Sequence, residues 1–344
     1  MTGNAANWFV DRHVTEGRSR SIAFREVFGS GREISYGELA ESSSKAASAL
    51  TASGIKEGDR AALFVLDQLE FPIIFWGCLK CGVVPVAINT LLSTDVYRTI
   101  LNDSNASIAY VSVELLDVVL PAISDCPSVK KVIVIGDSAS HEHLSWSEFM
   151  EGAEAFQTLE RADDDIAFWL YSSGSTGVPK GVRHKHEAMQ DTCETYAKQV
   201  LRVDESDIFF SAAKLFFAYG MGNGMTFPLS VGATSLLFNA RPTPQAVTEI
   251  LTVHKPTLYF GVPTLYAALV QQWETDESCP DVPLRMCVSA GEALPAEIGR
   301  KWKAMQNVDI LDGVGSTEML HIFLSNRPDD LVYGTSGKLS LIHI

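Results

Sequence analysis

The stretch Tyr171-Ser-Ser-Gly-Ser-Thr-Gly-Val-Pro-Lys-Gly181 follows the apolar run Ile166–Tyr171, which has the length and composition of a buried strand. Its three glycines let the backbone approach an anion closely, its four serine and threonine hydroxyls can donate to phosphate oxygens, and Lys180 adds a positive charge. The stretch is not a Walker A loop, because its lysine is not followed by serine or threonine. A plain surface turn explains this density of residues poorly, so we predict a phosphate-binding loop.

Outward from this loop, strand and helix patterns alternate along the chain, which predicts βαβ units and parallel sheets. The capping box Ser35-Tyr-Gly-Glu38 opens a helix that ends near Gly54, Ser93 caps another, and Thr243-Pro244 opens a third. Further helices are predicted at 69–81, 186–201 and 264–271. The predicted strands are 61–66, 83–88, 106–111, 131–135, 166–171, 208–212, 233–238, 257–261, 285–289 and 309–314.

Two more loops of unusual composition follow predicted strands. Ser289-Ala-Gly-Glu-Ala-Leu-Pro295 has small residues that would let a flat heterocycle lie against the backbone, although a strand-to-helix turn with Pro295 at the first helical position explains it nearly as well. Asp312-Gly-Val-Gly-Ser-Thr-Glu318 contributes the Thr317 hydroxyl and the Glu318 carboxylate. Glu318 is either a Mg²⁺ ligand or a residue that caps or pairs on a surface helix. Open parallel sheets bind ligands at the carboxyl ends of their strands, so these loops form a candidate site.

Net charge, hydrophobic runs and cysteine positions make several classes of protein poor matches for this sequence. The 344 residues carry a formal net charge of −15, which disfavours nucleic acid as a partner. The N-terminus has no basic and apolar signal pattern, and the most apolar regions, 61–92 and 224–238, are interrupted by charged residues, proline or glycine, so no membrane segment is expected. Cys78 and Cys81 lie among apolar neighbours and are interpreted as structural thiols. A cytoplasmic location follows from these features.

Together with Gly261-Val-Pro-Thr264, the three loops resemble the signature motifs of the adenylate-forming superfamily, which contains acyl-CoA synthetases, aryl-CoA ligases, luciferases and peptide-synthetase adenylation domains. The resemblance implies an α/β fold, the large N-terminal AMP-binding domain of that superfamily, at 1–338. It implies two αβ subdomains, about 1–160 and 161–338, built on mostly parallel sheets plus a partial distorted barrel. The weakly patterned stretch 138–165 is the expected junction.

The resemblance also implies substrates and site residues. The substrates would be ATP with Mg²⁺, coenzyme A and a small carboxylic acid. Thr176, Lys180 and Glu318 would be catalytic, with Glu318 as the metal ligand. The nucleotide would be held by Ser172, Ser173, Gly174, Ser175, Thr176, Gly177, Lys180, Gly291, Glu292, Ala293, Asp312, Gly313 and Thr317.

Within the superfamily, Lys214-Leu-Phe-Phe-Ala-Tyr-Gly-Met-Gly-Asn223 and Met319-Leu-His-Ile-Phe323 resemble benzoate–CoA ligases and other aryl-CoA ligases. Aromatic and small residues suit a flat slot for a ring, although core packing is a competing reading of Phe216, Phe217 and Phe227. His321 would orient the carboxylate or a ring substituent, and His184 and His186 are interpreted as structural. By this analogy the acyl pocket is lined by Ala218, Tyr219, Phe227, Ala290, Val314, Gly315, Leu320 and His321.

Several alternatives stay open at this point. The acid is benzoate, a hydroxybenzoate or aminobenzoate, a heteroaryl acid or a short aliphatic acid, and the resemblance allows a homodimer. Val332–Lys338 still fits the superfamily, whereas 339–344 departs from it, so we expect a small C-terminal domain with its assisting lysine to be missing and turnover to be impaired. The rival functions are a non-catalytic nucleotide-binding module and a γ-phosphate-transferring kinase, which the missing Walker A spacing disfavours.

Overall fold

A computed structural model describes residues 3–29, 31–136, 142–172 and 177–339 of the chain. The chain forms two compact units, the first from residues 1–20 and 34–188 and the second from 21–33 and 189–344. The division along the chain therefore lies at 188 rather than near 160, because the strands at 166–172 and 180–185 complete the first unit's sheet.

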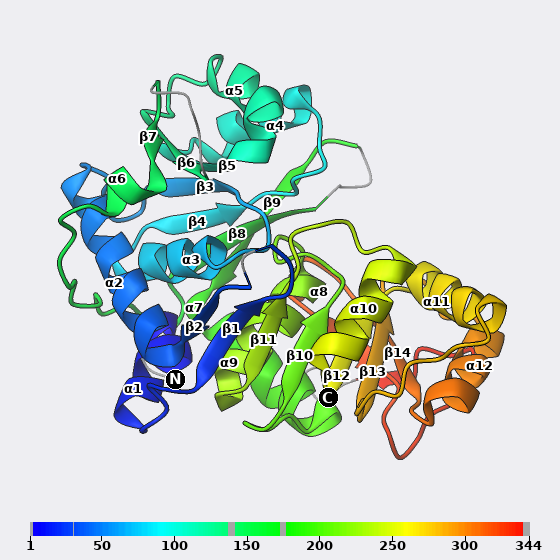
Figure 1. Cartoon of the computed structure of the whole chain (residues 1–344). Helices are drawn as coiled ribbons and strands as arrows, with labels where there is room; N and C mark the ends of the chain where they lie inside the picture. The colour runs from blue at the N-terminus through cyan, green and yellow to red at the C-terminus, as the bar shows by residue number, and fades with distance from the viewer. Residues whose placement is uncertain (1–2, 30, 137–141, 173–176, 340–344) are drawn as a thin grey trace. The chain divides into compact units, whose positions relative to one another are not determined.

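The first unit is built on a seven-stranded sheet in the order β7-β6-β5-β3-β4-β8-β9 (Figure 1). Neighbouring strands are parallel except β8 and β9, which form an antiparallel pair at one edge. The strands are β3 (Arg60–Phe64), β4 (Val84–Ala87), β5 (Ile108–Ser112), β6 (Lys131–Ile135), β7 (Leu144–Ser145), β8 (Ile166–Ser172) and β9 (Lys180–Lys185).

Helices cover both faces of this sheet, because strand residues are apolar on both sides. On one face α4 (Thr94–Ser104) and α5 (Leu116–Ile123) enclose a core. On the other lie α2 (Tyr36–Ala52), α3 (Glu70–Lys80) and α6 (Trp146–Met150), where the rings of Phe75 and Phe168 are 5.4 Å apart. The unit also contains η1 (Asn7–Asp11), α1 (Arg12–Thr15) and η2 (Val113–Leu115).

The second unit holds a nine-stranded sheet in the order β16-β15-β14-β13-β12-β10-β11-β1-β2, and its last strand, β2, lies where the chain passes back into the first unit. It is parallel from β1 to β14, while β14, β15 and β16 are antiparallel. The strands are β1 (Ile22–Glu26), β2 (Glu33–Ser35), β10 (Ile208–Ser211), β11 (Thr234–Leu237), β12 (Leu258–Gly261), β13 (Met286–Ala290), β14 (Ile310–Gly315), β15 (Ile322–Ser325) and β16 (Lys338–Leu339).

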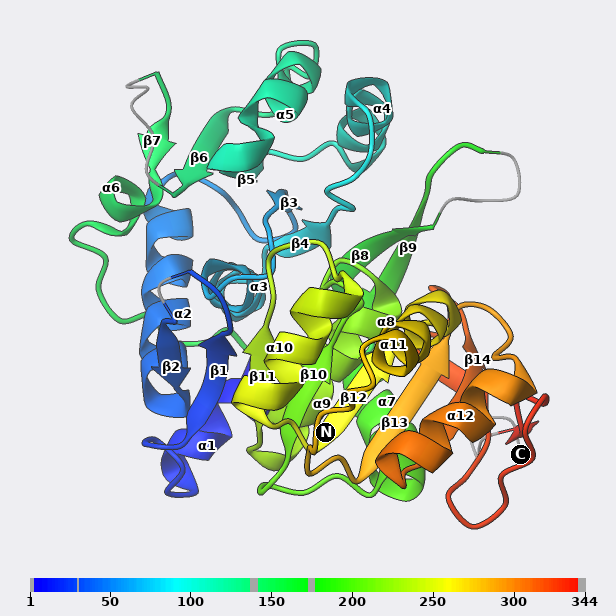
Figure 2. The same ribbon diagram turned by 45° about the vertical axis from the view of Figure 1, so that its right-hand side comes forward.

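Three helices cover one face of the second sheet, α10 (Pro244–His254), α11 (Pro263–Thr275) and α12 (Ala296–Gln306) (Figures 1 and 2). Strand residues alternate between faces, so Phe210 and Tyr259 join this core with Trp302. The opposite face is covered by short helices, in two groups on either side of β10 in the chain. These are α7 (His186–Thr192), which spans the division between the units, and then η3 (Cys193–Leu201), α8 (Ala218–Met221), η4 (Gly222–Thr226) and α9 (Phe227–Val231).

Most predicted elements are confirmed, and the differences have local causes. The Ser35 capping box and the Thr243 cap form as predicted. Ser93 occupies the N-cap of α4 without a side-chain hydrogen bond, and Pro295 is the N-cap of α12 rather than its first residue. The strands of the described residues belong to two sheets, and the implied distorted barrel is not a separate sheet among them. None of the helices in the described part of the chain combines the length and apolar character needed to cross a membrane.

Candidate functional site

The predicted phosphate loop falls between the paired strands β8 and β9 of the first unit. Ser172 pairs with Lys180 and Tyr171 with Gly181, so the hairpin holds both ends of the loop together. Gly177 has a φ of +77°, which only glycine adopts readily, and it is exposed like Lys180. Ser173, Gly174, Ser175 and Thr176 lie outside the described residues.

The base of this hairpin is anchored by aromatic side chains. The Tyr171 hydroxyl donates a hydrogen bond to Asp103 on α4, and burial together with that carboxylate raises the pKa of Tyr171. The guanidinium of Arg183 lies 5.2 Å from the centre of the Trp169 ring, a cation–π contact. Gly181 packs against the Trp169 and Tyr171 rings, and a Cβ there would lie 3.2 Å from each. The two strands on either side of the loop are thus held by side-chain contacts.

The other two predicted loops belong to the second unit and lie at the same sheet edge. β12, β13 and β14 are adjacent and parallel, and their register pairs Gly261 with Ser289 and Ala290 with Gly313. Their carboxyl ends therefore meet, as predicted. At the end of β13, Gly291 adopts a φ of +97°, and Glu292 and Ala293 are exposed.

Two buried polar atoms at this edge have no hydrogen-bond partner, the Ser289 hydroxyl and Asp312 Oδ1. The other carboxylate oxygen of Asp312 accepts a hydrogen bond from the Ser336 hydroxyl at 3.0 Å, and burial raises the pKa of this carboxyl. Gly313 follows on β14, where a Cβ would lie 2.8 Å from the Ile322 side chain. Buried polar atoms in proteins are normally paired, so unsatisfied ones mark a place where a ligand can bind.

The turn between β14 and β15 carries Thr317, which is half-buried, and Glu318, which is exposed. The Ser316 hydroxyl accepts a hydrogen bond from the Met319 N–H at 3.2 Å, and the Thr317 carbonyl accepts one from the Leu320 N–H at 3.1 Å. These bonds fix the turn that presents the hydroxyl and the carboxylate.

Leu320 closes this turn with a φ of +64°. The other non-glycine residues with positive φ in the described part of the chain follow helix ends, where such a conformation is common: Asn105, Arg202, Lys255, Glu277 and Asn307. Leu320 is a buried leucine between two strands, so its backbone is strained there. Gly315 makes room for the turn, because a Cβ there would lie 2.8 Å from the His321 carbonyl oxygen.

His321 is the centre of a buried aromatic cluster. Its ring centre lies 4.5 Å from that of Phe227, 5.3 Å from Tyr196 and 5.6 Å from Tyr219. Its Nε2 is 3.1 Å from Oδ1 of Asn223. Burial lowers the pKa of His321 to about 3, so the ring is neutral at neutral pH.

The predicted acyl-pocket residues divide by burial. Ala218, Phe227, Ala290, Leu320 and His321 are buried, Tyr219 is half-buried, and Val314 and Gly315 are exposed. The Tyr219 hydroxyl lies within hydrogen-bond distance of the Gly261 and Val288 carbonyls, at 3.2 and 3.1 Å. Phe216 is buried whereas Phe217 is exposed.

Sequence reasoning missed Tyr196 and Asn223 as members of this cluster. Gly222 was missed as well: a Cβ there would lie 2.3 Å from Cδ2 of His321, so only glycine allows the ring its position. The dense glycines at 220, 222 and 224 were the available signal, because glycine within a helical stretch marks a close approach.

The remaining titratable candidates pack inside the first unit. His186 accepts a hydrogen bond at Nδ1 from the Ala5 N–H at 3.1 Å, and His184 stacks on Phe168 with ring centres 4.9 Å apart. These contacts support the structural interpretation of both histidines. Cys78 and Cys81 are buried at the end of α3, and burial raises the pKa of both thiols, as expected for packed side chains.

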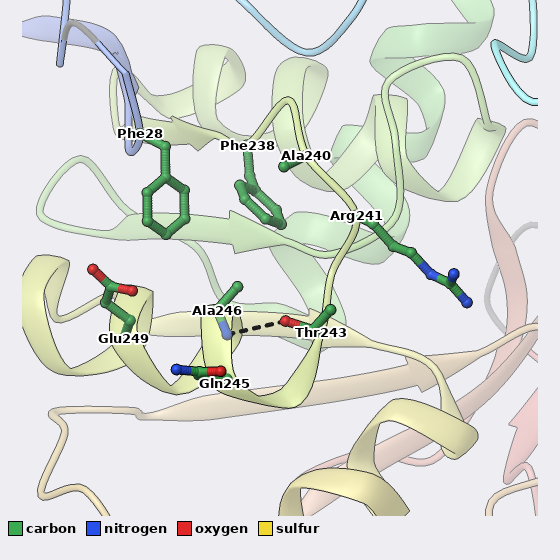
Figure 3. A pocket seen from close by; sticks show the side chains of 8 residues that line it. All are labelled: Phe28, Phe238, Ala240, Arg241, Thr243, Gln245, Ala246 and Glu249. Carbon is green, nitrogen blue, oxygen red and sulfur yellow. Dashed lines mark hydrogen bonds between the residues drawn. The ribbon is translucent and has the colours of Figure 1, made fainter.

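A separate hollow of about 280 Å³ lies in the second unit between Phe28, Phe238 and the first turns of α10 (Figure 3). Arg241 extends away from the two rings, and Thr243 accepts the hydrogen bond that caps α10. None of the predicted site residues lines it.

Comparison with known proteins connects these features to a family. The family model described as AMP-binding enzyme matches residues 10–341. The chain is 48% identical over 339 residues to a benzoate–CoA ligase of Thauera aromatica, covering 97% of this chain and 63% of that protein. It is 45% identical over 335 residues to a 4-hydroxybenzoate–CoA/benzoate–CoA ligase of Rhodopseudomonas palustris, covering 97% of this chain and 61% of that protein. The chain thus spans less than two thirds of the length of these relatives.

Solved structures agree with this similarity. A benzoate CoA ligase from Burkholderia xenovorans superimposes with a TM-score of 0.88 at 42% identity, covering 98% of this chain and 66% of that one. An anthranilate CoA ligase in complex with anthranoyl-AMP gives a TM-score of 0.94 at 34% identity, covering 99% and 65%.

Proposed function

Because this chain belongs to the AMP-binding enzyme family, we propose that it takes part in the ATP-dependent activation of an aryl carboxylic acid, with benzoate as the first candidate. The acid would be converted to its acyl-adenylate and then to the CoA thioester. The observation that carries this proposal is the aromatic cluster around His321. In the chain, His321 directly follows the turn that carries Thr317 and Glu318. The relatives named for benzoate and its hydroxy and amino derivatives support the same substrate class.

The proposed nucleotide contacts follow from the loops. Thr176, Lys180 and the other hydroxyls and glycines of the phosphate loop would bind the phosphates of ATP. Gly291 to Ala293 would lie against the adenine, because among the described residues other than its two chain neighbours no atom lies within 4 Å of the position that a Cβ of Gly291 would take, and a flat ring has room there. The unpartnered Ser289 hydroxyl and Asp312 Oδ1 are groups that a bound nucleotide would satisfy.

Glu318 suits Mg²⁺ chemically, because its carboxylate is exposed and offers hard oxygen ligands. Among the described residues no cluster of three or more His, Cys, Asp or Glu side chains could cage a metal ion. That agrees with Mg²⁺, which usually keeps several waters and takes one or two carboxylates together with substrate phosphates. When bound, Mg²⁺ would neutralise part of the phosphate charge.

The proposed reaction has two steps. A carboxylate oxygen of the acid attacks the α-phosphorus of ATP, the bond to the β-phosphate breaks, and pyrophosphate leaves. The CoA thiol then attacks the acyl carbon, AMP leaves, and the thiol proton is released. The first step brings an anion to a polyanion, so Lys180 and the loop hydroxyls would offset the repulsion. The neutral His321 adds shape and polarity to the acid's surroundings without adding charge.

Other parts of the proposal rest on the same resemblance. A hydroxybenzoate, an aminobenzoate or a short aliphatic acid is the alternative substrate, and binding without turnover is the alternative function. A cytoplasmic location, a homodimer and slow adenylation by these residues alone stay predictions. Release of pyrophosphate at the rate of a complete ligase would contradict the last of these.

The test is calorimetric binding of a benzoyl-sulfamoyl-adenosine, a stable mimic of the acyl-adenylate, compared with the acetyl compound. We expect clear preference for the benzoyl compound. Equal affinities would remove the aryl assignment, and no binding by a sample with a cooperative thermal melt would remove the proposed function. Product analysis separates the kinase reading, because adenylation gives AMP whereas γ-phosphate transfer gives ADP.

A further inference from the structure

The contact between Asn223 and His321 joins two distant parts of the second unit's chain. Asn223 is fully buried in η4, between α8 and α9, and His321 immediately precedes β15. Asn223 Oδ1 lies 3.1 Å from His321 Nε2. η4 is a π-helical segment, a rare and costly conformation that occurs often at functional sites.

The surroundings of the ring leave it little freedom. The Phe227 ring lies on one side, the Tyr196 and Tyr219 rings lie further out, and the backbone of Gly222 lies against the edge that bears Cδ2 and Nε2. These contacts restrict where the ring lies. They do not determine which nitrogen carries the proton, because only a hydrogen bond distinguishes the two nitrogens.

The ring carries a single N–H at neutral pH. Burial lowers the pKa of His321 to about 3, and the titratable groups that face it are the phenols of Tyr196 and Tyr219, whose pKa values burial raises. The 3.1 Å contact suits an Nε2–H donor with Asn223 Oδ1 as the acceptor.

We propose that Asn223 is a positioning residue that sets the preference for aryl over small acyl groups: its amide fixes the orientation and tautomer of His321, which forms a rigid wall of the acyl slot. This inference rests on the proposed function. An aryl ring gains from a fixed flat wall because its contacts need no further ordering, whereas an acetyl group is too small to reach most of that wall.

The first test compares Asn223→Ala with wild type in the calorimetric assay. We expect the affinity for benzoyl-sulfamoyl-adenosine to fall by about tenfold, because the variant loses the hydrogen bond that orders the wall. The affinity for the acetyl compound should change by less than about twofold. The control is Asn4→Ala. Asn4 is equally buried in the first unit, where its Nδ2 donates to the Leu79 carbonyl at 2.6 Å. That control is expected to lower the melting temperature and leave the benzoyl-to-acetyl ratio unchanged.

The second test compares Asn223→Asp, which keeps an oxygen acceptor, with Asn223→Leu, which keeps the volume of the side chain but has no acceptor. If Oδ1 accepts from His321, Asn223→Asp retains the benzoyl preference at pH 7.5 and Asn223→Leu loses it. A role limited to packing predicts that both variants retain it.

The outcomes are separable. A wild-type protein that binds neither mimic overturns the proposed function and with it this inference. A wild-type protein that prefers the benzoyl compound, with Asn223→Ala keeping that preference, overturns only the role of Asn223. If Asn223→Ala does not fold, the pair Asn223→Asp and Asn223→Leu decides, and an equal benzoyl preference in both overturns the assigned contact.

Discussion

His186 illustrates how a single residue sets a pH dependence. Its Nδ1 accepts the Ala5 N–H, and burial lowers its pKa from 6.5 to about 4. Between these values the unfolded chain binds a proton at this position that the folded chain does not bind, so stability falls as pH falls from 6.5 towards 4. We expect the free energy of unfolding in urea to drop by roughly 2 kcal/mol from pH 7 to pH 5 through this residue alone.

The variant His186→Gln isolates this contribution. It lacks a group that titrates in this range, so the difference in unfolding free energy between pH 7 and pH 5 should shrink relative to wild type. If the variant loses as much unfolding free energy between pH 7 and pH 5 as the wild type does, other groups cause the acid sensitivity. His321 shifts stability in the same direction, and its contribution should remain in the variant.

Lys180 supplies the second prediction at the residue scale. Its side chain is exposed at the start of β9, so Lys180→Ala should change stability by less than about 0.5 kcal/mol. The affinity for ATP with Mg²⁺ should fall by about tenfold or more, because a charge-assisted contact to phosphate is lost. Lys185→Ala, at the other end of β9, is the matched control. Equal ATP affinities of the two variants, measured by calorimetry, would contradict a phosphate role for Lys180.

At the scale of elements, the N-caps of α2 and α4 offer a matched pair. Ser35 forms a complete capping box with Glu38, whereas Ser93 makes no side-chain cap bond. We expect Ser35→Ala to lower the free energy of unfolding by about 1 kcal/mol and Ser93→Ala by only a few tenths. Denaturant titration of both variants measures this, and equal losses would show that the capping bond contributes little in this protein.

At the scale of the whole molecule, each unit has its own hydrophobic core, and the second unit also contains an ion pair with a buried carboxylate. In the second unit Arg285 forms a two-point contact with the buried Asp207, which also accepts a hydrogen bond from Thr257 at 2.8 Å. This network ties together the amino-terminal ends of β10, β12 and β13. Asp207→Ala should cost roughly 3 kcal/mol, because it leaves Arg285 without its carboxylate partner.

That loss should be local to one unit. Hydrogen exchange should accelerate in β10 to β14 and stay unchanged in β3 to β6, because the first unit has a separate core. Equal acceleration in both sheets would mean that the two units unfold as one.

The sequence by itself determined the type and order of most elements and the content of the three loops. The hydrophobic run before the phosphate loop and the capping signal Ser35-Glu38 are local patterns, and the strand and the helix cap that they predict form. The antiparallel partner β9 and the inserted strand β1 were not predicted, because pairing between strands is a non-local choice.

Only the tertiary structure decided the surroundings of His321. Asn223 and His321 are 98 residues apart in the chain, and Tyr196 is farther still, so no local pattern links them. The positive φ at Leu320 likewise runs against the intrinsic preference of leucine and exists only because the turn and the packing around it impose it. Composition determined which chemical groups were available, and the arrangement of β12, β13, β14 and η4 decided which of them meet, because that arrangement depends on the packing of the whole second unit.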